Sequence, residues 1–183
     1  MKENRLLNYT YNDRSPARRV VESMVRVHAP NEVWEMDIKY IYIQGANRTA
    51  YLFAIIDCFS REVVGKYLGY HCTSQDVKKT IDFSFLERGI QAISRVRIRS
   101  DNGTQFVSRI VELFLSSSQI EHERIHPATP KEDAHIESFN SILEKEVIRR
   151  FEFLSFENAE STIERFIAFY NNERLHSAID YRT

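Results

Sequence analysis

The sequence predicts an α/β domain with a mixed five-stranded sheet flanked by helices. Three apolar, strand-like segments follow one another with short turns, which suggests an antiparallel meander. Two shorter strand-like segments come later, separated by helical patterns, which suggests that they join the sheet in parallel. At 183 residues and 43% hydrophobic side chains, the chain is long enough for one well-buried core but hardly for two.

The first three predicted strands differ in pattern. Residues 33–43 alternate between apolar side chains and a second face that carries Glu35, Asp37 and Lys39, which predicts a strand with one polar face. The apolar run at residues 51–59 is typical of a central strand, and residues 62–70 supply the third.

The remaining elements follow from helical spacing and local caps. Apolar residues recur at helical spacing from about Thr73 to Arg88, then at 109–117, at 134–151 and from near Ser155 onward. Short strands are predicted at 95–100 and 120–125. The pattern at 134–151 predicts one long amphipathic helix.

The amino-terminal segment differs from the rest of the chain. Residues 1–30 are polar and weakly periodic, and they end at a proline. We expect them to form an arm or linker that precedes a core domain at residues 31–183.

Composition excludes several classes of protein. Lys plus Arg total 25 against 26 for Asp plus Glu, so any affinity for DNA must come from local patches. No apolar run approaches the roughly 20 residues that cross a bilayer, and the first residues lack a secretory signal, so we expect a soluble cytoplasmic protein. Cys58 and Cys72 have neither zinc-site nor disulfide-framework spacing and are expected to be buried thiols.

Three acidic residues have notable positions. Asp37 lies inside the first predicted strand, where Asp is rare. Asp101 directly follows the fourth strand, at the carboxyl end where open α/β sheets place ligand sites. Glu137 lies one turn inside the long helix. Taken singly, each has an ordinary explanation: an ion-paired strand residue, an Asp-Asn-Gly turn and a solvated helix residue.

Considered together, the three acids indicate a metal site. A strand, a strand end and a helix can bring them together above the sheet, where their mutual repulsion would be costly without cations. Carboxylate oxygens are the ligands that Mg²⁺ and Mn²⁺ prefer. Two such ions roughly 3.5–4 Å apart can stabilise the attacking and leaving oxygens of an in-line phosphoryl displacement. The pattern therefore predicts a metal-dependent nuclease or strand transferase.

Several motifs resemble the integrase core of bacterial insertion-sequence transposases and retroviral integrases. They are WEMDIKYI, DCFSREVVG, SDNGTQF, HIESFN with LEKE, and YNNERLH, and the resemblance covers about residues 31–180. The 35 residues between Asp101 and Glu137 match the spacing of that family's DDE signature. The resemblance implies a ribonuclease H-like fold, whose order of strands and helices agrees with the order predicted above.

The resemblance also implies a function. The chain would be a transposase or integrase catalytic core that cleaves DNA ends and transfers strands by two-metal phosphoryl transfer. Asp37 would bind two Mg²⁺ or Mn²⁺ ions, Asp101 would complete one site, and Glu137 would complete the other. Element ends and target DNA would be the partners, and the active complex would be a homo-oligomer.

Other residues are weaker candidates. Possible DNA contacts are Lys131, Lys145, Asn102 and Arg174. Asn102 could instead shape the loop behind Asp101, Lys145 is as readily a solvated side chain, and Arg174 either packs or touches DNA. His135 is a minor candidate for a ligand or general base.

Two other functions stay open from the sequence. One is a different ribonuclease H-like nuclease that acts on RNA–DNA hybrids or junctions. The other is a non-catalytic DNA-binding remnant of a transposase. The 35-residue spacing favours transposition over the first, and the presence of all three acids argues against the second.

Overall fold

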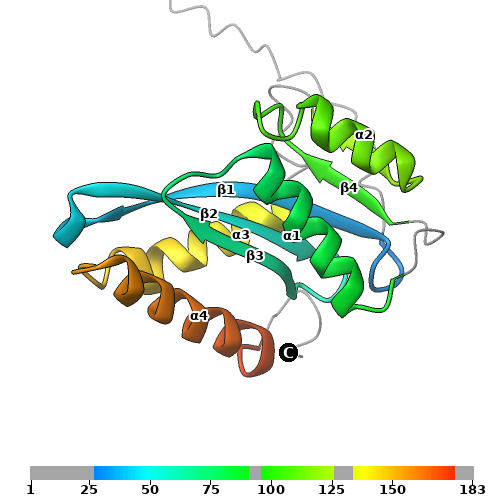
Figure 1. Ribbon diagram of the computed structural model, residues 1–183. Helices are drawn as coiled ribbons and strands as arrows, with labels where there is room; N and C mark the ends of the chain where they lie inside the picture. Colours follow the sequence, from blue (N-terminus) through cyan, green and yellow to red (C-terminus); the bar gives the residue numbers. More distant parts are fainter. Residues whose placement is uncertain (1–26, 91–95, 126–133, 176–183) are drawn as a thin grey trace, which may run out of the picture.

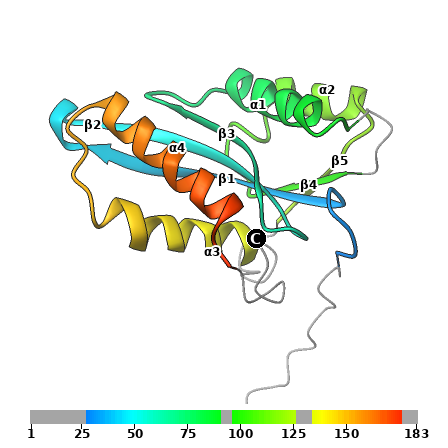
Figure 2. The same ribbon diagram turned by 90° about the horizontal axis from the view of Figure 1, so that it is seen from below.

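The structure, a computed structural model, describes residues 27–90, 96–125 and 134–175. Within them, one sheet has the strand order β3-β2-β1-β4-β5 (Figures 1 and 2). The strands are β1 (Val33–Ile43), β2 (Arg48–Asp57), β3 (Val63–Gly69), β4 (Arg97–Ser100) and β5 (Glu121–Arg124). The pairs β1–β2 and β2–β3 are antiparallel, whereas β1–β4 and β4–β5 are parallel. The predicted mixed sheet is confirmed.

Helices cover both faces of this sheet (Figure 2). One face carries α1 (Ser74–Glu87) and α2 (Arg109–Ser117), and the other carries α3 (Ala134–Leu143) and α4 (Phe156–Asn172). Each face has its own apolar cluster. The α1–α2 side buries residues such as Trp34, Met36, Phe53, Ile81 and Ile98, and the α3–α4 side buries residues such as Ile41, Leu52, Phe139, Ile163 and Tyr170.

Side-chain caps fix the starts of three helices. The Thr73 side chain accepts the Asp76 N–H while the Asp76 carboxylate accepts the Thr73 N–H, which is a capping box at the start of α1. The Ser108 and Ser155 side chains each accept one backbone N–H group, at the starts of α2 and α4 respectively. These local signals explain why the helix starts could be placed from the sequence.

The prediction that β1 has one polar face was wrong. Glu35 is 0% exposed, and Ile41 and Ile43, which share its face, are also 0% exposed. Tyr40 and Tyr42, expected on the apolar face, are 63% and 49% exposed. Tyr40 and Tyr42 are exposed because the β1–β2 hairpin extends past the end of α1 (Figure 1). Ile41 and Ile43 are buried because they belong to the apolar cluster of α3 and α4 on the opposite face.

The predicted single helix at 134–151 is interrupted. The α-helix α3 ends at Leu143 and continues as a π-helical turn, η2 (Glu144–Ile148), in which the Arg149 N–H donates to Glu144 O at 3.0 Å. Val147 stays buried, so the apolar stripe survives this change of winding.

The segment after η2 is attached to the tip of the β1–β2 hairpin. The Gly45 N–H donates to Phe153 O at 3.0 Å, and the Gln44 side chain accepts the Phe153 N–H at 2.8 Å. A Cβ atom at Gly45 would lie 1.8 Å from Leu154 O, so only glycine permits this approach. The carboxyl end of the α3–η2 segment is therefore tied to the hairpin.

Within the described ranges, every helix is too short or too polar to cross a membrane. The predicted arm at residues 1–30 lies mostly outside those ranges, and the predicted domain boundary at residue 31 stays a prediction.

Phe139→Ala should destabilise the protein strongly. Phe139 is 0% exposed and packs against Phe166 and Tyr170, so its loss removes apolar burial and leaves a cavity. We expect a loss of about 3–5 kcal/mol in the free energy of unfolding, measured by urea denaturation. Phe83→Ala is the matched control, because Phe83 is 60% exposed on α1 and its loss should cost less than about 0.5 kcal/mol. Equal costs for the two variants would contradict the packing described here.

Candidate active site

Two of the predicted carboxylates lie side by side at the carboxyl end of β4. In the parallel pairing of β1 with β4, Met36 is opposite Ser100, and the next residue along each chain is Asp37 and Asp101. Asp37 is half-buried and Asp101 is exposed. The register of the two central strands therefore brings together two acids that are 64 positions apart in the sequence.

The Asp37 carboxylate is held from two sides. Its Oδ1 accepts the Ile38 N–H and its Oδ2 accepts the Asn140 amide, both at 2.7 Å. Burial raises the pKa of Asp37, and the nearby Asp101 charge raises it further, against the lowering effect of these two hydrogen bonds. Asp101 is oriented by the Gly103 N–H, which donates to its Oδ1 at 2.9 Å.

The third predicted acid lies on a different element. Glu137 is an exposed residue in the first turns of α3, and Asn140 on the same helix reaches Asp37. Residues three apart on a helix are neighbours on its surface. Glu137 is thus a surface neighbour of Asn140 on α3, while the binding of two cations by Asp37, Asp101 and Glu137 stays a prediction.

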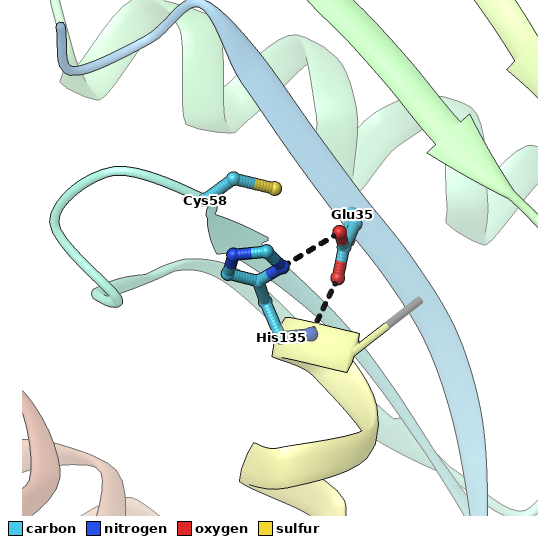
Figure 3. A group of neighbouring side chains, drawn as sticks. All are labelled: Glu35, Cys58 and His135. Carbon is cyan, nitrogen blue, oxygen red and sulfur yellow. Dashed lines mark hydrogen bonds and ion pairs between the residues drawn. The ribbon is translucent and has the colours of Figure 1, made fainter. Parts of the chain in front are cut away.

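Among the described residues, a different group has its possible ligand atoms within 4.8 Å of one another. It consists of Glu35, Cys58 and His135 (Figure 3). Glu35 Oε2 accepts the backbone N–H groups of His135 and Ile136 at 3.0 and 2.9 Å, and its Oε1 lies 3.0 Å from His135 Nδ1. Glu35 on β1 therefore binds the amino-terminal end of α3 directly.

A row of charges crosses the sheet at the level of Glu35. Arg99 on β4 is opposite Glu35 in the register and opposite Glu123 on β5. Its Nη1 lies 3.5 Å from Glu35 Oε1, and its Nε and Nη2 donate to Glu123 at 3.2 and 2.9 Å. Burial raises the pKa of Glu35, while the Ile136 N–H, Cys58, Arg99 and Arg61 act in the opposite direction.

This group suits a helix cap better than a metal site. The two helix N–H groups and the Arg99 guanidinium already supply positive charge to both Glu35 oxygens. A cation would have to displace these groups or bind against their repulsion. Burial also raises the pKa of the Cys58 thiol, which favours the protonated form over the thiolate that binds metals. His135, a minor candidate ligand from the sequence, is instead a neighbour of Glu35.

The candidate DNA contacts have different environments. The Asn102 amide donates to Ile125 O at 3.1 Å, which supports the loop after β4. Arg174 Nη1 is paired with Glu146 at 2.7 Å, and Lys145 is exposed on η2. Lys131 lies outside the described residues. DNA binding by these four residues stays a prediction.

Asn171, part of the same YNNERLH motif as Arg174, has a structural role. Its side-chain oxygen accepts the Val63 N–H at 2.9 Å, and its amide nitrogen donates to Val63 O at 3.0 Å. It therefore pairs with the backbone of β3, the edge strand of the sheet, as a neighbouring strand would. His176, also part of that motif, lies outside the described residues.

Sequence reasoning missed three residues of the site. Glu35 and Arg99 were assigned no role, and Asn140 was not considered. A signal existed for two of them: Glu35 is two residues before Asp37 and Arg99 is two before Asp101, so each shares a strand face with an acid of the site. Asn140 follows Glu137 by one helical turn.

Comparison with known proteins agrees with this architecture. Two family models, both described as integrase core domain, match residues 27–130 and 118–183. An insertion element IS476 protein of Xanthomonas euvesicatoria is 31% identical over 149 residues, covering 81% of this chain and 42% of that protein. The transposase for insertion sequence element IS904 of Lactococcus lactis is 28% identical over 171 residues, covering 90% and 64%. The chain spans about half the length of the first relatives it matches, 42% and 56%.

Solved structures show the same fold. The HTLV-2 integrase catalytic core domain, solved with magnesium, has a TM-score of 0.59 at 22% identity, covering 83% of this chain and 94% of that one. The Mos1 mariner transposase catalytic domain has a TM-score of 0.60 at 17% identity, covering 75% and 70%. The fold is ribonuclease H-like, as the sequence predicted. With the family models matching more than half of its residues, this chain belongs to the integrase core domain family of transposases and integrases.

Proposed function

We propose that this chain cleaves DNA ends and transfers strands as a polynucleotidyl transferase, with Asp37, Asp101 and Glu137 as its catalytic residues. The observation that carries the proposal is the adjacency of Asp37 and Asp101 across the parallel β1–β4 pair, with α3 docked beside them through Asn140. Membership of the integrase core family supplies the class of reaction.

The three side chains fit divalent cations. Asp37 is partly desolvated and repelled by Asp101, so an ion between them would relieve an unfavourable arrangement. All-carboxylate donors are the set that Mg²⁺ and Mn²⁺ prefer. Related folds were solved with these ions, magnesium in the HTLV-2 integrase core and manganese in the Mos1 domain. We infer that Asp37 would bind both of two ions, Asp101 one and Glu137 the other.

Two such ions, when bound, stabilise the charge on the attacking and leaving oxygens of a phosphoryl displacement. The chain itself supplies orientation. The Ile38 and Gly103 N–H groups fix one oxygen of Asp37 and one of Asp101 before any ion arrives. Preorganised ligands of this kind reduce the cost of assembling the reacting groups.

DNA is the proposed partner, both as element ends and as target. Relatives include a transposase of an insertion sequence, and the structural neighbours include a retroviral intasome and dimeric and trimeric integrase cores. We infer that this chain likewise acts as a homo-oligomer.

Asp101→Asn should abolish chemistry while keeping the fold. We expect Mg²⁺- or Mn²⁺-dependent cleavage and joining of labelled DNA to fall by about 10³-fold or more, because removing one ligand charge raises the barrier by at least roughly 4 kcal/mol. Asp82→Asn is the matched control, since Asp82 is exposed on α1 on the opposite side of the sheet, and it should retain full activity.

Each other outcome of that assay has a definite meaning. Robust joining by the Asp101→Asn variant would contradict the assignment. Cleavage without joining would favour a ribonuclease H-like nuclease, and no activity together with no metal binding would favour a non-catalytic remnant.

Asp37→Asn should raise the melting temperature of the metal-free protein at pH 7. The folded state raises the pKa of Asp37, so its ionised form destabilises the fold once the pH exceeds the unfolded-state pKa, and Asn carries no charge to repel Asp101. We expect an increase of a few degrees in EDTA at pH 7 that shrinks toward pH 4, near the unfolded-state pKa of an aspartate, because the charge that the fold disfavours is progressively lost there. Thermal unfolding at both pH values measures it, and a lower melting temperature at pH 7 would contradict the repulsion.

A further inference from the structure

We propose that Glu35 is a positioning residue for the candidate active site: its buried carboxylate caps α3 and thereby sets Glu137 relative to Asp37. This inference rests on the proposed function, because it assigns Glu35 a role in preparing that same site. Glu35 itself would touch neither DNA nor a cation.

Glu35 caps the start of α3. The first N–H groups of a helix have no partners within the helix, and a carboxylate placed there also interacts favourably with the helix dipole. Glu35 supplies both effects from another element, since its Oε2 accepts the His135 and Ile136 N–H groups. These are the two residues immediately before Glu137. The carboxylate therefore fixes the backbone from which the Glu137 side chain extends.

The spacing of residues along β1 constrains α3 further. Glu35 and Asp37 are two residues apart, so they share a face of the strand and are separated by roughly 6.6 Å along it. Glu35 binds the start of α3, and Asp37 binds Asn140 one turn further along the same helix. Two successive side chains on one face of the strand thus hold two successive turns of one helix, which limits how far α3 can slide or rotate.

The far end of the helical segment is also attached to the sheet. Gly45 and Gln44 at the tip of the β1–β2 hairpin bind Phe153, just beyond η2. The α3–η2 segment is attached to the same hairpin at both ends. Removing the Glu35 cap would release the end that carries Glu137 and leave the other end attached.

Arg99 connects the Glu35 cap to the strand that precedes Asp101. Arg99 lies on β4, two residues before Asp101. It is placed between Glu35 and Glu123 and contacts both. The opposite charge compensates part of the cost of burying Glu35, which is 0% exposed. The row Glu35–Arg99–Glu123 therefore lies beside the Asp37–Asp101 pair, two residues earlier along the strands and on the same face of the sheet.

Binding of Mn²⁺ to the 183-residue chain, measured without DNA by electron paramagnetic resonance of the free ion, tests the proposal. The variants are Glu35→Gln, Glu137→Gln and the double variant. Loss of a residue that orients a metal ligand typically weakens metal affinity about tenfold or more, so we expect that loss for Glu35→Gln. In the Glu137→Gln background the same change should alter the affinity by less than about twofold, because the ligand that Glu35 positions is gone.

Glu123→Gln is the matched control. It removes the other carboxylate bound by Arg99 but leaves the α3 cap intact, so it should leave Mn²⁺ affinity within about twofold of the unmodified chain. An equal loss of affinity in Glu123→Gln would assign the effect to the charge row and overturn the capping role.

The outcomes separate this inference from the proposed function. Mn²⁺ binding that is weakened by Asp37→Asn but unchanged by Glu35→Gln overturns the inference alone. An equal effect of Glu35→Gln with and without Glu137 also overturns it, since the residue would then act on stability in general. Binding insensitive to Asp37→Asn overturns the proposed function, and binding lost in Cys58→Ala places the ion in the Glu35 group instead.

Hydrogen exchange gives a readout that does not depend on metal. In Glu35→Gln, the amides of His135 and Ile136 should exchange faster, while an amide of α4 such as that of Ile163 keeps its rate. A uniform acceleration across α3 and α4 would show global destabilisation and would contradict the local cap.

Discussion

The parallel pairing of β1 with β4 is the constraint on which the rest of the site depends. It sets Glu35 opposite Arg99 and brings Asp37 beside Asp101 two residues further along the strands. The same register therefore produces two layers on one face of the sheet, a buried layer of opposite charges and a more exposed layer of like charges. In the first layer the opposite charges compensate part of the cost of burying Glu35, and in the second the like charges repel each other until a cation is present.

The two layers are coupled through α3. Its backbone binds Glu35 and its Asn140 side chain binds Asp37, so the helix that carries Glu137 is oriented by the same strand that carries the first acid. Exposed ion pairs elsewhere, such as Lys66 with Glu164, contribute at most about 1 kcal/mol and do not influence this geometry. The geometry of the site comes from backbone N–H groups that donate to the Glu35, Asp37 and Asp101 carboxylates, since hydrogen bonds to a charged acceptor are stronger than neutral ones.

Much of this architecture could be predicted from the sequence, for reasons that differ between elements. The limits of β1 were predicted because alternation at 33–43 is strong, and α1 because Thr73 begins a capping box. The burial of Glu35 could not be predicted, since alternation alone marks a polar position as solvent-facing, and only the topology shows that a helix covers it. The π turn at η2 was missed because an apolar stripe with Leu143 and Val147 fits either winding. The sequence predicted that Asp37 and Asp101 lie close together, but the strand register that makes them neighbours came only from the structure.

Anomalous diffraction from crystals soaked in Mn²⁺ would test the central claim most directly. The account predicts manganese density in contact with both Asp37 and Asp101, with Glu137 turned toward it from α3, and none at Glu35, where the helix cap and Arg99 already supply positive charge. Density bound by Glu35, Cys58 and His135, or an empty space between Asp37 and Asp101 at saturating Mn²⁺, would contradict it.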